Sequence, residues 1–407
     1  MRYQLSAPSQ LHTRVNLPAS KSISNRALIL NALSYSPYLP ENLSDCDDTR
    51  VMVEAFDSNS NRFDIGAAGT SMRFLTAFLA KIGGVWEITG SERMQNRPIR
   101  ILVDALQACG AQIEYLGKEG YPPLRITGRA LKGGELQLDG GTSSQYISAL
   151  LMIAPTMMEG LTLNLTGKMI SKPYIRMTLG MLERFGIASE WEGSRIRICP
   201  QAYTPTRFRV ESDWSAASYW YEMVALAAAG EAELLGLEKE SLQGDARIAE
   251  FFEPLGVETI FTETGVRLRK TDSHADRIEL DLTDQPDLAQ TLVVTCVLKN
   301  IPFRFSGLES LKIKETDRIV ALQNELRKLG YVVGSKNDNT LYWEGERCTP
   351  ATSPVIATYE DHRMAMAFAP AAFCDTNIVI EHPEVVSKSY PAFWNDLQKA
   401  GFSVEEV

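Results

Sequence analysis

Two kinds of apolar segment alternate along the chain. In the first kind, apolar residues are spaced as on one face of a helix, and a Gly follows the last turn. One copy has Ile99, Leu102, Val103 and Leu106 at positions i, i+3, i+4 and i+7, followed by Gly110. This spacing predicts an amphipathic helix. The Gly predicts its end, because Gly readily adopts the left-handed backbone conformation that closes helices.

Copies of this helix recur at a regular interval. They start near residues 47, 97, 172, 244, 314 and 388. The last copies end at Gly330 and Gly401, and the apolar residues after each Gly predict strands.

The second kind of segment opens with small, polar or charged residues and continues as an apolar, Ala-rich helix. The six openings are Ser20-Lys21-Ser22, Gly69-Thr70-Ser71, Ser143-Ser144-Gln145, Asp213-Trp214-Ser215, Asp287-Leu288-Ala289 and Glu360-Asp361-His362-Arg363. In both series the first step is about 50 residues and the later ones are 70 to 75. We therefore infer six copies of one unit, the first of them shortened by about 25 residues.

The order within a copy predicts an α/β fold of βαβαββ units. The second kind of helix is apolar on most sides, so we expect it to be buried inside each domain, with the amphipathic helices and the sheets outside. Six units are too many for one core, which predicts two domains of three units each. We expect residues 1–18 and 213–407 to form a discontinuous domain, and residues 19–212, with the shortened unit, to form an inserted one.

Composition and charge narrow the function. The chain has 407 residues and a net charge of -10, which disfavours nucleic acid as a partner. None of its six cysteines forms a C-x-x-C pair and no H-x-x-x-H occurs, so we expect no metal. No apolar run reaches the roughly 18 residues of a membrane span, and Met1 does not open a signal peptide. Unpaired cysteines and the missing export signal predict a cytoplasmic protein.

Cations gather where helices are expected to begin. They are Lys21, Arg26, Arg73, Arg97, Lys172, Lys314, Arg318, Arg363 and Lys388. Lys314 and Arg318 are four residues apart, as are Ser22 and Arg26, which predicts a shared helix face for each pair. Cations at a helix N-terminus oppose the helix dipole. Anionic ligands bound there would resolve this conflict, and several such helices would bind more than one anionic group.

Seven segments, in order, resemble motifs of one enzyme family. They are Ala19–Arg26, Gly69–Arg73, Arg97–Ile99, Ser143–Gln145, Ser171–Tyr174, Lys314–Arg318 and Tyr359–Met364. The family they resemble is 5-enolpyruvylshikimate-3-phosphate synthase (3-phosphoshikimate 1-carboxyvinyltransferase). The resemblance runs from about residue 5 to the C-terminus.

The resemblance implies a fold and a reaction. The family fold is a two-domain inverse α/β prism, with three βαβαββ units per domain around buried helices and the active site in the cleft between the domains. The family enzyme joins the 5-hydroxyl of shikimate 3-phosphate to C2 of phosphoenolpyruvate, while C3 takes a proton. The tetrahedral adduct then loses phosphate and the C3 proton. This is the sixth step of the shikimate pathway to chorismate and aromatic amino acids, and no metal or organic cofactor takes part.

The resemblance also implies residue roles. Asp287 would accept the 5-hydroxyl proton, Glu315 would handle the proton at C3, and Lys21 would contact both substrates and assist proton transfer. The residues implied for shikimate 3-phosphate are Lys21, Ser22, Arg26, Ser143, Ser144, Gln145, Ser171, Tyr174, Asp287, Ser310 and Lys314. Those implied for phosphoenolpyruvate are Lys21, Gly69, Thr70, Arg97, Gln145, Arg318, His362, Arg363 and Lys388.

The chain departs from the family pattern at three positions, and three competing functions stay open. Ala67, Phe74 and Ser310 differ from the usual family residues. The sister enolpyruvyl transferase that acts on UDP-N-acetylglucosamine usually has Asn where Ser22 stands, and a loop Cys that this chain lacks. The second competing function is that of an inactive paralogue that binds anionic metabolites or a protein partner, and the third is nucleic-acid 3′-end chemistry. We expect a monomer, because no coiled-coil repeat or amphipathic extension indicates a partner.

Overall fold

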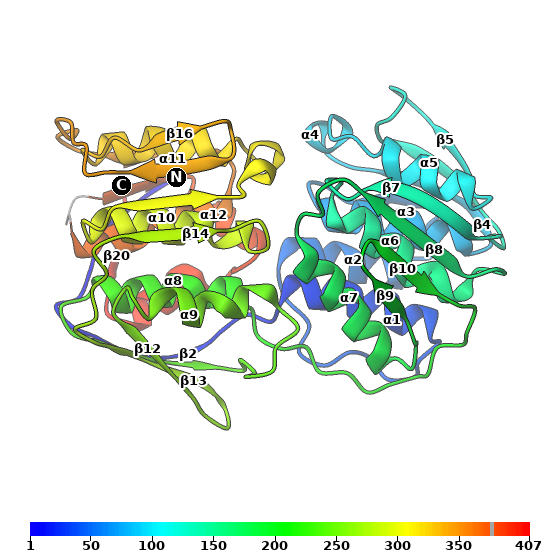
Figure 1. Ribbon diagram of the computed structural model, residues 1–407, viewed down its shortest axis with the longest axis horizontal. Helices are drawn as coiled ribbons and strands as arrows, with labels where there is room; N and C mark the ends of the chain where they lie inside the picture. The colour runs from blue at the N-terminus through cyan, green and yellow to red at the C-terminus, as the bar shows by residue number, and fades with distance from the viewer. Residues whose placement is uncertain (375–377) are drawn as a thin grey trace. The chain divides into compact units, whose positions relative to one another are not determined.

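The computed structural model describes residues 1–374 and 378–407, and it is a mixed α/β structure (Figure 1). The chain divides into two compact units. Unit 1 comprises Met1–Pro18 and Glu211–Val407, and unit 2 comprises Ala19–Val210. Within the described residues, no helix is long and apolar enough to cross a membrane.

Unit 2 contains the predicted strand and helix order twice. Its third repeat consists of β7 (Gly134–Asp139), α6 (Ser144–Ile153), the short 3-10 helix η1 (Ala154–Thr156), β8 (Leu161–Thr166), α7 (Lys172–Arg184), β9 (Glu190–Glu192) and β10 (Arg195–Ile198). The second consists of β3 (Arg62–Asp64), α3 (Gly69–Lys81), β4 (Gly84–Thr89), α4 (Glu92–Gln95), α5 (Arg100–Ala108), β5 (Gln112–Tyr115) and β6 (Leu124–Gly128). The predicted βαβαββ order is thus confirmed in both copies.

The first repeat of unit 2 lacks such a sheet. It contains the helices α1 (Lys21–Leu33) and α2 (Asp47–Asp57). Between these helices, the only β pairing among the described residues is an isolated bridge between Glu41 and Arg209. The short interval between the first two repeats in the sequence therefore corresponds to missing strands.

Unit 1 uses the same plan, but its sheets need strands from both ends of the chain. Its elements are β1 (Arg2–Ser6), β2 (Leu11–Asn16), α8 (Trp214–Leu226), β11 (Gly230–Leu235), η2 (Gly244–Arg247), α9 (Ile248–Phe252), β12 (Val257–Phe261), β13 (Gly265–Lys270), β14 (Ile278–Asp281), η3 (Pro286–Leu288), α10 (Ala289–Leu298), β15 (Phe303–Ser306), η4 (Glu309–Ile313), α11 (Arg318–Lys328), β16 (Gly334–Lys336), β17 (Thr340–Trp343), β18 (Val355–Ile356), α12 (His362–Phe368), η5 (Ala369–Phe373), β19 (Ile378–Glu381), η6 (Pro383–Lys388), α13 (Phe393–Lys399) and β20 (Ser403–Glu406). Strand β2 pairs in parallel with β11, and β1 lies between β19 and β20. These pairings hold residues 1–18 in unit 1, although their partner strands lie more than 200 residues later in the sequence.

The described residues form five four-stranded sheets with one common pattern. In each sheet the two strands at one end are parallel, as in β7 with β8 and β14 with β15. The other two strands pair antiparallel, as β10 does with β8 and β9. Repetition of this pairing in every sheet follows from repetition of the apolar pattern, because register is fixed by which side chains face the core.

The apolar, Ala-rich helices are buried, as their sequence predicts. All ten residues of α10 and all seven of α12 are buried. Helices α8 and α10 run side by side within unit 1 (Figure 1). The amphipathic helix α5 instead buries one side and exposes the other. Each buried helix thus begins at or near polar residues, while the rest of it lies in the core.

Three predicted helix starts are wrong by several residues. Helix α5 begins at Arg100, α11 at Arg318 and α13 at Phe393. Proline explains the first and last, because the residue before a Pro avoids helical backbone, and Pro98 and Pro391 follow Arg97 and Tyr390. Asp317 explains α11, since its side chain caps the helix by accepting from Val320 N at 3.2 Å. Lys314 and Arg318 therefore do not share a helix face.

The buried carboxyl of Glu222, in the middle of α8, gives a prediction about stability. Burial raises its pKa well above 4.5, and the side chain of Thr295 offsets this only in part. The unfolded chain therefore loses the proton at lower pH than the folded protein. Stability should fall by up to about 1.4 kcal/mol per pH unit as pH rises above about 4.5.

We expect Glu222→Gln to remove this part of the pH dependence and to be more stable than the natural protein at pH 7 to 8. Urea unfolding between pH 5 and pH 8 measures it. The same slope in both proteins would contradict a proton held by Glu222.

Candidate active site

Arg318, the first residue of α11, binds three carboxylates of unit 1. Its Nε lies 2.7 Å from Asp361 Oδ2, its Nη1 3.0 Å from Asp287 Oδ1 and its Nη2 2.9 Å from Glu315 Oε2. The side chain is 1% exposed. Burial alone would lower the pKa of the guanidinium, but Asp361, Glu315 and Asp287 together raise it above its ordinary value. Arg318 therefore stays charged and fixes two of the three residues predicted to be catalytic.

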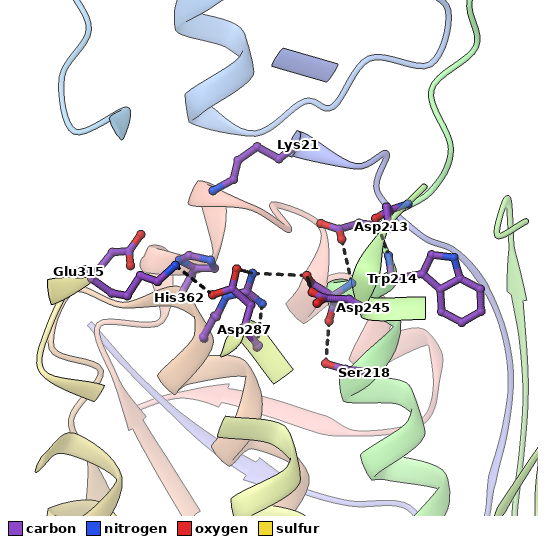
Figure 2. Close-up of polar contacts among 12 residues, drawn as sticks. Lys21, Asp213, Trp214, Ser218, Asp245, Asp287, Glu315 and His362 are labelled. Carbon is purple, nitrogen blue, oxygen red and sulfur yellow. Dashed lines mark hydrogen bonds and ion pairs between the residues drawn. The ribbon is translucent and has the colours of Figure 1, made fainter. Parts of the chain in front are cut away.

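Three further cations face the same carboxylates. Lys314 Nζ lies 3.6 Å from Asp287 Oδ1, and Arg363 Nη2 lies 3.2 Å from Asp287 Oδ2. Lys388 Nζ lies 3.3 Å from Glu315 Oε1. The carboxylates are held on different elements: Asp287 belongs to η3, directly before α10, and Glu315 precedes α11. Figure 2 shows Asp287, Glu315 and His362 of this cluster.

Asp361 contacts the side chain of Arg318 and the backbone of Arg363. It caps α12 by accepting from Arg363 N at 2.9 Å, while its carboxylate also binds Arg318. Asp361 is 0% exposed, and the neighbouring His362 is 2% exposed, with Nδ1 3.8 Å from Asp361 Oδ1. Burial raises the pKa of Tyr219 to about 12, although Arg363, 3.5 Å from its hydroxyl, acts in the opposite direction. At neutral pH the Tyr219 hydroxyl therefore keeps its proton, and this uncharged side chain lies beside Arg363.

In unit 2, two guanidinium groups converge on the N-terminus of α3. A Cβ on Gly69 would lie 2.6 Å from Arg97 Nη1 and 2.9 Å from Arg73 Nη1. Arg73 Nη1 donates to Gly69 O at 2.7 Å. Burial, with repulsion from Arg97 second, lowers the pKa of Arg73 to about 10. Two neighbouring cations at a helix N-terminus form a strong anion site, because the free backbone N–H groups there favour negative charge as well.

Helices α6 and α7 of unit 2 also begin with polar residues, and α6 contacts the anion site. Gln145 Nε2 donates to Thr70 Oγ1 at 3.0 Å, which connects α6 with α3. Ser143 caps α6 and Ser144 is its first residue. Ser171 precedes α7 with φ of 55°, and Tyr174 lies in its first turn.

The first motif divides into an accessible and a buried part. Lys21 Nζ lies 3.6 Å from Asp48 Oδ2 and is 18% exposed. Arg26 points into unit 2, where it donates to Thr178 Oγ1 at 2.8 Å, Ser148 Oγ at 3.0 Å and Ser22 O at 2.8 Å. Burial lowers the pKa of Arg26 to about 10, which leaves it charged at neutral pH. Ser22 and Arg26 lie four residues apart in α1, as the sequence predicts.

Comparison with known proteins now identifies the family. The family model of EPSP synthase (3-phosphoshikimate 1-carboxyvinyltransferase) matches residues 5–59 and 54–397. A curated protein of Bacteroides fragilis, named 3-phosphoshikimate 1-carboxyvinyltransferase, is 58% identical over 406 residues, which cover 100% of this chain and 99% of that protein. The chain belongs to the EPSP synthase family.

Less similar proteins of the same name support this assignment. A protein of the same name from Aliivibrio salmonicida is 36% identical over 421 residues, covering 96% of this chain and 97% of that protein. A solved EPSP synthase from Acinetobacter baumannii matches the fold with a TM-score of 0.80 at 20% identity, covering 100% of both chains. The resemblance drawn from the seven motifs is confirmed, as is the α/β fold class.

The predicted EPSP synthase residues are divided between the two units. Unit 1 holds Asp287, Ser310, Lys314, Glu315, Arg318, His362, Arg363 and Lys388. Unit 2 holds Lys21, Ser22, Arg26, Gly69, Thr70, Arg97, Ser143, Ser144, Gln145, Ser171 and Tyr174. Ser310 lies on η4, shortly before Lys314 in the chain. Among the described residues, no three His, Cys, Asp or Glu side chains gather as a metal site would require.

Sequence reasoning did not assign roles to three residues of these clusters. Asp361 looks like any helix cap in the sequence, and Asp48 stands in the degraded first repeat. Tyr219 stands among apolar residues of a buried helix. The sequence could have singled out Asp361, since an acidic cap followed directly by His and Arg is unusual at the start of a buried helix.

Proposed function

We propose that this chain transfers the enolpyruvyl group of phosphoenolpyruvate to the 5-hydroxyl of shikimate 3-phosphate and releases phosphate. Family membership supports the substrate pair. The observation that carries the chemistry is the pair of carboxylates, Asp287 and Glu315, held on one buried guanidinium. They supply a base and a proton carrier, and the surrounding cations neutralise anionic substrates.

The proposed steps balance with these groups. As the 5-hydroxyl oxygen bonds to C2 of phosphoenolpyruvate, Asp287 takes its proton, and C3 gains a proton through Glu315 with help from Lys21. In the second step, C3 returns a proton to Glu315 while the C2–O bond to phosphate breaks, and the departing phosphate takes the proton from Asp287, so both carboxyl groups return to their starting state. The cations Lys314, Arg363 and Lys388 already contact these carboxylates, so they can stabilise the charges that develop.

We assign the substrates to residues of both units. For shikimate 3-phosphate, the hydroxyl and amide groups at the starts of α6 and α7, with Ser22 and Lys21, would bind the phosphate and ring. For phosphoenolpyruvate, Arg97 beside Gly69 in unit 2 and Arg318, Arg363 and Lys388 in unit 1 would bind the carboxylate and phosphate. Arg26 makes three contacts inside unit 2, so we assign it mainly the positioning of Ser22. We also propose that the protein acts as a monomer in the cytoplasm.

The assay that tests the function is phosphate release from phosphoenolpyruvate, with shikimate 3-phosphate or UDP-N-acetylglucosamine as acceptor. Release with shikimate 3-phosphate alone supports the proposal. Release with UDP-N-acetylglucosamine would favour the sister transferase. Folded protein that releases phosphate with neither acceptor would overturn both and favour a binding role.

Gly69→Ala should weaken phosphoenolpyruvate binding more than shikimate 3-phosphate binding. The new Cβ would lie 2.6 Å from Arg97 Nη1, so this guanidinium must move away from the N-terminus of α3. We expect KM for phosphoenolpyruvate to rise about tenfold, the loss of one charge-assisted hydrogen bond. Steady-state kinetics with each substrate varied in turn measure this, and an unchanged KM for phosphoenolpyruvate would contradict the assignment. Gly83→Ala is the control, because a Cβ there meets nothing within 4 Å.

A further inference from the structure

A fourth carboxylate lies beside the Arg318 cluster without a role in the steps above. Asp245 belongs to η2, which follows β11 in the fourth repeat, and is 6% exposed. Its Oδ2 accepts a hydrogen bond from Ser215 Oγ, on the first turn of α8. The charged groups that act on it are Asp287 of η3, Arg363 of α12 and Asp213, the cap of α8. Figure 2 shows Asp245 with Asp213 and Asp287.

Ser215 connects Asp245 with the predicted substrate-binding cation. Ser215 Oγ accepts from Arg363 Nη2 at 3.4 Å, and the same Nη2 lies 3.2 Å from Asp287 Oδ2. An ionised Asp245 can only accept, so the Ser215 hydroxyl must donate to it and turn its lone pairs toward Arg363. The direction of the hydroxyl thus depends on the carboxylate behind it. The backbone N–H of Arg363 is fixed separately, because it donates to Asp361, the cap of α12.

We propose that Asp245 is a positioning residue of the active site, which acts through Ser215 to hold the Arg363 guanidinium in place for the carboxylate or phosphate of phosphoenolpyruvate. This inference rests on the function proposed above, since it assigns Arg363 to that substrate. Asp245 itself need not touch a substrate. Its effect passes through one hydroxyl, and both Asp245 and Ser215 are buried, which limits exchange with water.

The ionisation of Asp245 supports a role beyond packing. Burial raises its pKa to about 7, Asp287 and Asp213 add to the rise, and Arg363 and the Ser215 hydrogen bond act against it. The group therefore changes charge near neutral pH, beside Asp287 and Arg363. When Asp245 is protonated, Ser215 is no longer required to donate toward it, and the hold on Arg363 weakens.

The experiment compares Asp245→Ala, Asp245→Asn and Ser215→Ala with the full-length natural chain, by steady-state kinetics at pH 6 to 8.5. For Asp245→Ala and Ser215→Ala we expect KM for phosphoenolpyruvate to rise about tenfold, while KM for shikimate 3-phosphate changes less than about threefold. Because both act through one hydrogen bond, the double variant should be no worse than either single variant. Asp245→Asn keeps an acceptor for Ser215 and should recover most of the loss.

The pH profile separates this role from a structural one. The ratio of KM for phosphoenolpyruvate in Asp245→Asn to that in the natural protein should change with pH around 7, since only the natural protein titrates there. Asp396→Asn is the matched control, because Asp396 is also buried in unit 1 but contacts Tyr390 and Lys399. Its KM values should stay unchanged.

Each outcome decides a different claim. If Asp245→Ala loses stability but keeps its KM values, or if the Asp245→Ala and Ser215→Ala effects add, the positioning role is overturned. A flat ratio across the pH range would also overturn it. If the natural protein itself shows no turnover with shikimate 3-phosphate, the proposed function fails first, and the two failures cannot be confused.

Discussion

Asp287→Asn should lower kcat by about 10²- to 10⁴-fold while both substrates still bind, which is the effect expected for loss of a general base. The amide has the same shape and can still accept from Arg318, but it cannot take the proton of the 5-hydroxyl. Asp287 is the candidate for this base, and Arg318, Lys314 and Arg363 all lie within 3.6 Å of its carboxylate oxygens. These contacts hold the carboxylate in one orientation.

Kinetics and binding must be measured together for this variant. Isothermal titration with shikimate 3-phosphate should give a Kd within about threefold of the natural protein, a change below about 1 kcal/mol. If loss of this affinity is instead the main effect, Asp287 binds the substrate and is not the base. Asp281→Asn is the control, because Asp281 is exposed and accepts from Thr283 in a loop of the same unit.

Arg318→Ala should have the largest effect on stability, a loss of about 3–5 kcal/mol, together with loss of turnover. Removal of the guanidinium leaves Asp361, which is 0% exposed, without its buried cation, and leaves Asp287 and Glu315 to repel each other. Truncation of one partner of a buried ion pair costs more than the pair contributes, because the remaining charge stays out of water.

The free energy of unfolding from urea titration measures the first effect, and phosphate release measures the second. Arg318→Lys should recover part of the stability but little activity, since one ammonium cannot bind three carboxylates in the geometry of a planar guanidinium. Arg327→Ala, at an exposed position of the same helix, is the control and should change stability by less than about 0.5 kcal/mol. A loss in Arg318→Ala no larger than this would contradict the clamp.

Much of the fold could be predicted from local patterns. The Ala-rich segments after Asp213 and Asp287 predicted buried helices, and α8 and α10 are buried almost throughout. Helix starts were less predictable where several polar residues competed. Asp317 caps α11 and places Lys314 outside it, although the spacing alone favoured a longer helix.

The candidate site was predicted as a set of residues but not as an arrangement. Arg26 and Arg318 have similar sequence surroundings, each a cation near a helix start. The structure turns Arg26 inward to Thr178 and Ser148, whereas Arg318 meets Asp287 and Asp361. Contacts between residues so far apart in sequence depend on which elements pack together, and the local pattern does not contain that information.

The sequence by itself determined the repeat, the helix and strand order, the family and the types of side chain available for anion binding and proton transfer. These properties depend on spacing and residue type within one segment, where helix periodicity and capping act. Only the tertiary structure decided that Arg318 is clamped by three carboxylates, that Asp48 accompanies Lys21, and that Asp245 stands behind Ser215. The physical reason is that charge, burial and hydrogen bonding at these positions come from side chains that only the packed helices bring within a few ångströms of one another.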